Sequence, residues 1–197
     1  MGLTDPMTAK PPPRKGPRLA TARYLENAAL HYLERFASSS ANLKRVLMRK
    51  VARSQRFHGS DAAEGERLVD AIIARYLEAG LLDDAGYAAQ KAASLRRRGS
   101  SRFGIRGKLA AKGVDSELID STLDRLDEES GDGDLAAACA LVRRRRLGPY
   151  RAPESRAEHR QRDLAALARA GFGLDLARRV LAAPDPDALE AMARGEE

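Results

Sequence analysis

One helical pattern recurs three times along this chain. The sequence LAAKGV occupies 109–114 in the middle copy and LARAGF occupies 167–172 in the last, and further leucines stand nine and fourteen positions after the first in both. When Leu47 of a degenerate first copy is aligned with these leucines, Val51 replaces the glycine, and the copies lie 62 and 58 residues apart. This spacing suits a three-helix module. Repeated modules typically offer an extended surface to a partner, whereas an enzyme gathers unlike segments around one pocket.

Composition indicates that these modules are helical. The 197 residues are 43% hydrophobic but only 5% aromatic, and there is no Trp, so Leu, Ala, Val and Ile must fill the core. A core rich in Leu and Ala suits helices. No segment of any length alternates apolar with polar residues, as a half-buried strand would. The sequence therefore predicts an all-α protein, a tandem array of three three-helix units that forms an elongated, curved monomer.

Breaks in the helical pattern divide the chain. Residues 1–17 combine prolines with basic residues, lack the apolar run of a secretory signal, and predict a disordered basic arm. Gly80 ends the cleanest amphipathic stripe, the Ser, Gly and Asp run at 130–134 separates two helical stretches, and Pro184 and Pro186 follow the last one. We therefore expect units at 18–80, 81–130 and 131–185, and a C-terminal tail at 186–197.

The charge balance points to an acidic partner. Thirty-five Lys and Arg against 28 Asp and Glu give a formal net charge of +7. Such an excess favours nucleic acid or an anionic protein surface as the partner. The competing interpretation is a soluble helical protein whose many arginines are only solvated.

Two basic clusters stand out, one in each of the last two units. Arg102 and Arg106, like Lys108 and Lys112, are four residues apart and so share a helix face. Because basic runs recur at the ends of the first helices of two units, a role in binding phosphate or carboxylate groups is favoured over an ordinary charged surface. Aromatic residues among them are few, which makes base stacking a weak hypothesis. The candidate binding residues are Lys91, Arg96, Arg97, Arg98, Arg102, Arg106, Lys108, Lys112, Arg143, Arg144, Arg145, Arg146 and Arg151.

Carboxylates form a separate group between Asp115 and Asp134. We interpret them as the solvated face of the third helix of the second unit, with a basic patch on a partner as the alternative. Asp83 and Asp84 stand at a predicted helix start, where the helix dipole favours negative charge. Helix capping is therefore preferred to a pair of acid and base catalysts.

Signals for catalysis or metal binding fail on inspection. Residues 99–104, GSSRFG, have the glycine spacing of a phosphate loop, but Ile105 and Arg106 replace the required Lys and Ser or Thr, and no strand precedes them. The three histidines are scattered, and Cys139 in its apolar stretch is typical of a buried thiol in a reducing cytoplasm. No apolar run approaches the roughly 20 residues of a membrane span. We expect no enzyme activity, metal, cofactor or membrane association.

The second unit also carries a motif that resembles the bacterial RecX regulatory proteins. Its most specific piece is LLDDAGYA at 81–88, and the third unit is similar to that family at 143–150 and 163–172. The resemblance covers approximately residues 24–183. Its structural motif residues are Leu82, Asp83, Asp84, Tyr87, Ala88, Leu109, Gly113, Leu167, Gly171 and Phe172.

The resemblance implies a cytoplasmic, non-enzymatic regulator of recombinational DNA repair and the SOS response. Members of this family bind the filament that the RecA recombinase forms on DNA, impede its growth, and depress its ATPase and strand-exchange activities. The implied partner is therefore the RecA filament, with single- or double-stranded DNA as a further candidate. The alternative is a tandem helix-turn-helix DNA-binding protein that acts independently of RecA. Whether binding needs RecA discriminates between the two.

Overall fold

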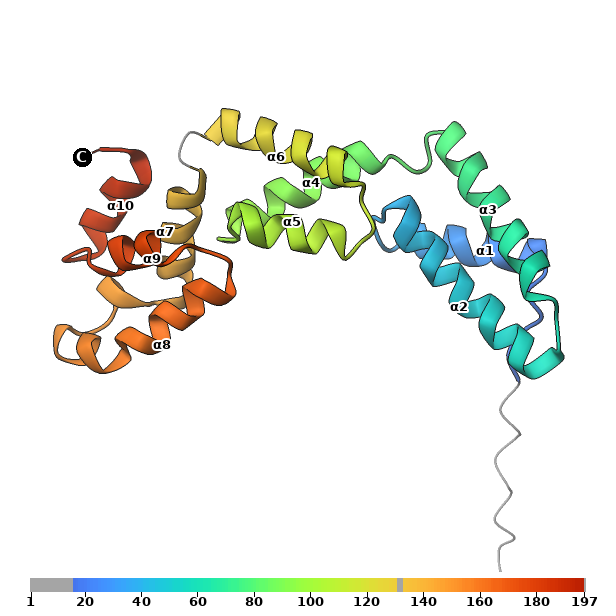
Figure 1. Ribbon diagram of the computed structural model, residues 1–197, viewed down its shortest axis with the longest axis horizontal. Coiled ribbons are helices and arrows are strands. Elements are labelled where there is room, and N and C mark those ends of the chain that lie inside the picture. Colours follow the sequence, from blue (N-terminus) through green and yellow to red (C-terminus); the bar gives the residue numbers. More distant parts are fainter. Residues whose placement is uncertain (1–15, 131–132, 197) are drawn as a thin grey trace, which may run out of the picture.

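The structure is a computed structural model that describes residues 16–130 and 133–196. This part of the chain contains ten α-helices, two short 3-10 helices and no strand, which confirms the predicted all-α class (Figure 1). The 3-10 helices are η1 (Gly148–Tyr150) and η2 (Pro153–Ser155). The α-helices are α1 (Ala22–Leu33), α2 (Ser40–His58), α3 (Ala62–Glu78), α4 (Asp84–Arg97), α5 (Arg102–Ala110), α6 (Ser116–Ser130), α7 (Gly133–Arg145), α8 (Arg156–Arg169), α9 (Leu174–Leu181) and α10 (Pro186–Arg194).

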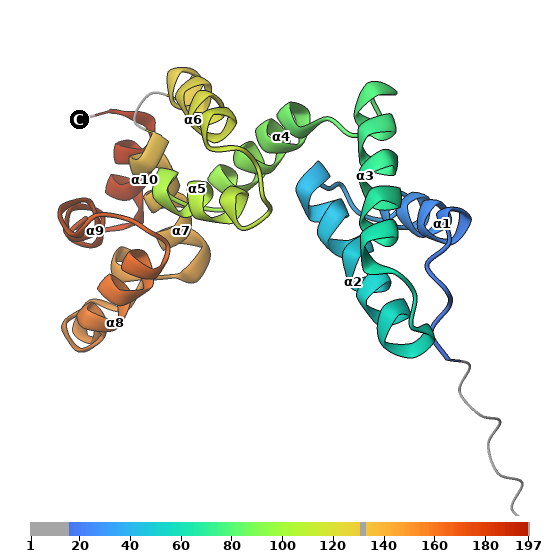
Figure 2. The same ribbon diagram turned by 45° about the vertical axis from the view of Figure 1, so that its right-hand side comes forward.

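The helices follow one another along the long axis of an arched molecule. Figure 1 shows α1–α3 at one end, α4–α6 in the middle and α7–α10 at the other end, and the turned view in Figure 2 keeps this order. We refer to these groups as units 1, 2 and 3. The arrangement agrees with the predicted elongated and curved array.

Each unit encloses its own small core. In unit 1 the cluster extends from Leu25 to Leu82, in unit 2 from Ala88 to Leu123, and in unit 3 from Leu135 to Leu189. Because apolar side chains are buried mainly against neighbours within the same unit, the array can extend without a central core.

Short polar side chains start most of the helices. Thr21, Ser39, Asp61, Asp83 and Ser101 stand at the N-caps of α1 to α5, and each accepts a hydrogen bond from an amide of the first turn. These contacts satisfy amides that have no partner within the helix. The capping predicted for Asp83 is therefore observed.

The segment predicted as a C-terminal tail instead contains α10. Asp185 caps this helix by accepting from the Ala188 amide, Pro186 occupies its first position, and Leu189 is fully buried against unit 3. A proline at the first helical position needs no hydrogen-bond donor and favours the start of a helix. The sequence analysis was wrong here because it treated Pro186 only as the end of the preceding helix.

The predicted basic arm and the predicted break at 130–134 fall partly outside the described residues. Of the arm, only Gly16 and Pro17 are described, and the Pro17 carbonyl lies 2.7 Å from the His58 ring nitrogen in a hydrogen bond. Of the break, Gly131 and Asp132 are not described, and α7 begins directly after them at Gly133.

Candidate partner-binding surface

Arg96, one of the predicted binding residues, is buried between units. Its side chain is 8% exposed and forms ion pairs with Asp127 on α6 and Asp134 on α7. A guanidinium buried between two carboxylates has its charge compensated within the protein. Arg96 therefore joins unit 2 to unit 3, and the structure does not place it on an open surface.

The arginines of α5 also have carboxylate partners. Arg102 pairs with Asp124 at 2.6 Å and with Asp127, while Arg106 pairs with Asp120. These three aspartates lie on α6, so part of the acidic group binds the basic helix beside it, whereas Asp115, Glu117 and Glu128 are exposed. The solvated face predicted for this helix is therefore observed only in part, because α5 packs against α6 and brings some of the opposite charges together.

Arg151 belongs to a buried ion pair in unit 3. Its Nε donates to one oxygen of Asp163 and its second guanidinium nitrogen to the other, both at 2.8 Å, while the Gly148 amide donates at 2.9 Å. The Asp163 side chain is only 2% exposed. Burial alone would raise the pKa of Asp163, but the hydrogen bonds from Arg151 and Gly148 together hold that pKa below its ordinary value.

Arg143 makes an ion pair with α10. Its guanidinium lies 3.1 Å from a Glu190 carboxylate oxygen, and the Tyr150 hydroxyl donates to the same carboxylate at 2.9 Å. This arginine thus faces the helix that replaces the predicted tail.

Four cations that remain without a carboxylate partner come together where units 2 and 3 meet. In the described residues, no carboxylate lies within ion-pair distance of Lys91 and Arg98 from the α4 side, Lys108 on α5, or Arg144 on α7. We call these residues the cation cluster. Gly99, just after α4, packs directly against Leu141 of α7. Because Arg98 precedes Gly99 in the chain, this contact brings Arg98 toward the end of α7.

Electrostatic repulsion within the cation cluster is evident at Lys108. Desolvation lowers the pKa of its ammonium group, and the positive charges of Arg144, Lys91 and Arg98 lower it further. The Lys108 Nζ donates to the Ser100 hydroxyl at 2.8 Å, a neutral partner. An anion bound at the cluster would relieve this repulsion.

The cation cluster continues along one face of α4. Tyr87, Lys91, Ser94 and Arg98 are spaced by four, three and four residues, which aligns them along the helix over about 16 Å. At the Tyr87 end, α4 and the segment after α1 form a groove of about 330 Å³. The groove is lined by Arg35, Phe36, Ala37, Tyr87, Gln90, Lys91 and Ser94.

Two comparisons with known proteins identify the family. The family model of the second three-helix domain of RecX matches residues 83–123. The regulatory protein RecX of Myxococcus xanthus strain DK1622 is 46% identical over 168 residues, covering 85% of this chain and 89% of that protein. This chain belongs to the RecX family. The regulatory protein RecX of Agrobacterium fabrum strain C58 is 29% identical over 159 residues, covering 81% of this chain and 82% of that protein. No solved structure matches the chain.

The resemblance to RecX proteins is thereby confirmed, and the structure places the motif residues in the cores and at the junctions of the units. Those in the cores are buried or packed against the buried clusters: Leu82, Tyr87, Ala88, Leu109, Leu167 and Phe172. Gly113 and Gly171 have positive φ angles of 74° and 90°. Asp84 does not cap its own helix but reaches α2, where it accepts from the Ser40 amide at 2.7 Å.

The remaining predicted binding residues are not gathered in one place. Arg97, Arg145 and Arg146 are exposed, and Lys112 is half-buried beyond the end of α5. In the described part of the chain, none of these four has a carboxylate within ion-pair distance. They enlarge the positive region of this RecX-family chain, but they do not form a defined site.

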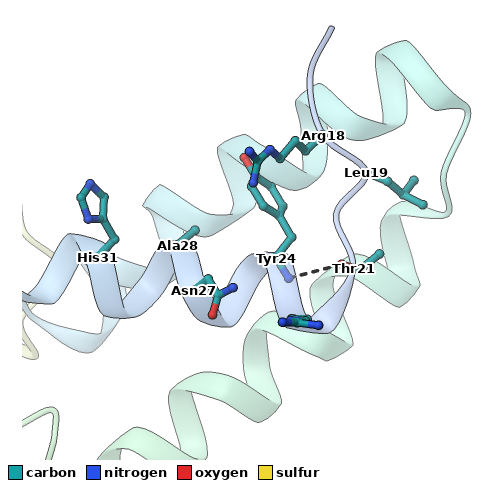
Figure 3. A pocket seen from close by; sticks show the side chains of 8 residues that line it. Arg18, Leu19, Thr21, Tyr24, Asn27, Ala28 and His31 are labelled. Atoms are coloured by element: carbon teal, nitrogen blue, oxygen red, sulfur yellow. Dashed lines mark hydrogen bonds between the residues drawn. The ribbon is translucent and has the colours of Figure 1, made fainter. Parts of the chain in front are cut away.

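A hollow lies at the outer end of unit 1, far along the array from the cation cluster. Figure 3 shows its lining on α1 and the segment before it, and its volume is about 590 Å³. The hollow is open, and its lining residues are Arg18, Leu19, Thr21, Arg23, Tyr24, Asn27, Ala28 and His31. The carboxylate next to His31 is that of Glu34, 3.6 Å away, and both side chains are largely exposed to solvent.

The described residues contain no group of three His, Cys, Asp or Glu side chains that could hold a metal ion. None of the helices in this part of the chain combines the length and apolarity needed to cross a membrane. The relatives are named regulatory proteins, which agrees with a protein that acts by binding.

Sequence reasoning missed Asp134 and Phe36. Asp134 joins α7 to Arg96 and to the Arg102 amide, and its position directly after Gly133 in a break of the helical pattern gave no sign of this role. Phe36 is 52% exposed beside the α4 groove. In the sequence Phe36 continues the apolar helical spacing of Tyr32 and Leu33, so nothing distinguished it from a buried residue.

Proposed function

We propose that this protein regulates the RecA recombinase by binding the RecA filament on DNA and inhibiting its extension, ATPase and strand exchange. The observation that carries the proposal is the cation cluster, in which four cations from three helices lack carboxylate partners among the described residues. Membership of the RecX family supports the choice of partner. Action on a recombinase places the protein in the cytoplasm, and we expect it to act as a monomer.

The mechanism is steric and additive. Each unit of the curved array binds the filament with modest affinity. Once one unit is bound, the next unit is held close to its own site at a high effective concentration, so the linked contacts together bind more tightly than any one of them. The face of α4 from Tyr87 to Arg98 supplies cations for acidic side chains of the filament or for DNA phosphates. An array bound along the filament hinders the addition of further subunits.

The alternative, a DNA reader that acts independently of RecA, would require the basic second helix of a unit to enter a groove. In unit 2 that helix is α5, and its two arginines are already paired with carboxylates of α6. These pairs weaken the alternative, which the following experiment tests as one of its outcomes.

The test replaces three members of the cation cluster together, Lys91→Gln, Lys108→Gln and Arg144→Gln, and measures suppression of the DNA-dependent ATPase of the cognate RecA. The control variant Arg49→Gln, Arg53→Gln and Arg56→Gln removes the same charge from exposed positions on α2. Loss of three charge contacts, two from the exposed Lys108 and Arg144 and one from the half-buried Lys91, should raise the half-inhibitory concentration by about tenfold. The control should inhibit as the wild type does, and added salt should weaken inhibition because exposed charges are screened.

Equal inhibition by the two triple variants would show that the cation cluster is not the binding surface. A wild-type protein that binds duplex DNA tightly and leaves cognate RecA filaments unaffected would contradict the regulator proposal. That outcome would support the independent DNA reader.

A further inference from the structure

The two junctions between units use the same hydrogen bond from the second helix of one unit to the next unit. At the first junction, the Ser39 hydroxyl caps α2 and also donates to the Lys112 carbonyl at 2.6 Å. At the second, the Ser101 hydroxyl caps α5 and also donates to the Ala170 carbonyl at 2.8 Å. In both cases the acceptor is the residue just before the repeated glycine.

A second contact is repeated one residue later. The first amide of α2, that of Ser40, donates to Asp84 at 2.7 Å, and the first amide of α5, that of Arg102, donates to Asp134 at 2.7 Å. Each aspartate lies in the first turn of the first helix of the following unit. A carboxylate at this place satisfies a free amide and complements the positive end of the helix dipole.

The repeated glycine allows the same close approach at both junctions. A Cβ atom on Gly113 would lie 2.6 Å from the Ala41 Cβ, and one on Gly171 would lie 2.5 Å from the Ser101 Oγ. Any larger residue would therefore push the adjacent units apart. Two constraints therefore require glycine at this position of the repeat: the close approach of the preceding unit and the positive φ angle.

These contacts occur only where two described units meet. Ser155, at the start of α8, corresponds to Ser39 and Ser101, but its hydroxyl donates to the Ala152 carbonyl within unit 3. In unit 1, Val51 occupies the place of the repeated glycine, and α2 continues past it to His58. The set of contacts is thus specific to the junctions, which distinguishes it from ordinary helix capping.

We propose that these contacts are positioning elements for partner binding, and we call them the junction clasps: Ser39 and Ser40 with Lys112 and Asp84, and Ser101 and Arg102 with Ala170 and Asp134. Because the same contacts join helix ends at both junctions, they give unit 2 a similar orientation relative to unit 1 as unit 3 has relative to unit 2. A regular array fits a partner whose own subunits repeat at regular spacing. The inference rests on the proposed function, in which that partner is the RecA filament.

The clasps also assemble the candidate surface. The first holds the segment at Phe36 beside Tyr87 of α4. The second holds α7 against the end of α4, where Gly99 meets Leu141, and the charge of Arg144 on α7 lowers the pKa of Lys108. Linked contacts add only when the geometry lets them form together. Loosening a clasp should therefore weaken partner binding even when each unit remains folded.

The test measures the distance between spin labels at Arg53→Cys on α2 and Arg169→Cys on α8, two exposed positions in units 1 and 3. Native Cys139 is buried, at 3% exposure. In this background Asp84→Ala should at least double the width of the distance distribution. The matched control Asp83→Ala removes a cap that lies entirely within unit 2 and should leave the width unchanged.

A second variant, Ser40→Pro, removes the Ser40 amide and hydroxyl, both of which donate to Asp84, and leaves the Ser39 hydroxyl in place. Proline is tolerated at the first helical position, so α2 should keep its helix content, as circular dichroism would report. Asp84→Ala and Ser40→Pro should each raise the half-inhibitory concentration for the cognate RecA ATPase at least fivefold, whereas Asp83→Ala should not.

Unchanged label distances in both clasp variants, or broadened distances with full inhibition, would overturn the inference. Absence of inhibition by the wild-type protein contradicts the proposed function instead. In that case the label distances alone decide whether the clasps set the spacing of the units.

Discussion

At the scale of single residues, Asp163 is the carboxylate with the clearest role in stability. It is almost fully buried and accepts hydrogen bonds from Arg151 and from the Gly148 amide. Asp163→Asn should lower the free energy of unfolding at neutral pH by about 3 kcal/mol, because Arg151 loses its charge partner. Urea denaturation would measure the loss. The control Asp175→Asn, at an exposed residue 3.9 Å from Arg178, should change little.

The same pair determines how stability depends on pH. Because the pKa of Asp163 is lowered in the folded protein, its contribution is present above the ordinary carboxyl pKa and is lost as pH falls through the folded value. The difference between wild type and Asp163→Asn should therefore shrink in acid. If the difference in unfolding free energy between wild type and Asp163→Asn stays constant as the pH falls below the folded pKa of Asp163, the charge of Asp163 is not what stabilises unit 3.

At the scale of helices, α5 carries basic residues with opposite roles. Arg102→Glu would place a carboxylate beside Asp124 and Asp127, and we expect a loss of about 1–2 kcal/mol from the broken charged hydrogen bonds. Lys108→Glu would place one beside Arg144, Lys91 and Arg98, so stability should stay the same or rise. Thermal melting of the two variants tests the contrast. Equal destabilisation would mean that charge pairing does not distinguish the two positions.

At the scale of the whole molecule, the chain should behave as an extended array. A compact globule of this length has a radius of gyration of about 16 Å. Solution X-ray scattering should give a larger value, because the three cores lie in succession along the molecule (Figure 1). The value should stay larger after removal of residues 1–17. A compact value for that shortened chain would contradict the array.

The sequence by itself determined the helical class, the recurrence of the units and the resemblance to the RecX family, because apolar spacing and helix caps are local signals. Leu47, Leu109 and Leu167 are each fully buried, as their equivalent positions in the repeat require. Pro186 shows where the local sequence was insufficient, because proline occurs both at the start of a helix and after its end. Here the burial of Leu189 in the core of unit 3 favours the start of α10.

Only the tertiary structure decided which charges remain for a partner. Arg96 and Arg98 are two positions apart in one basic run, yet Arg96 is buried between two carboxylates and Arg98 is exposed. Asp84 follows a capping residue but binds the preceding unit. The partners of these charged side chains are the groups close to them in space, carboxylates of α6 and α7 for Arg96 and the Ser40 amide of α2 for Asp84. Because these groups are distant in the sequence, no local pattern could assign them.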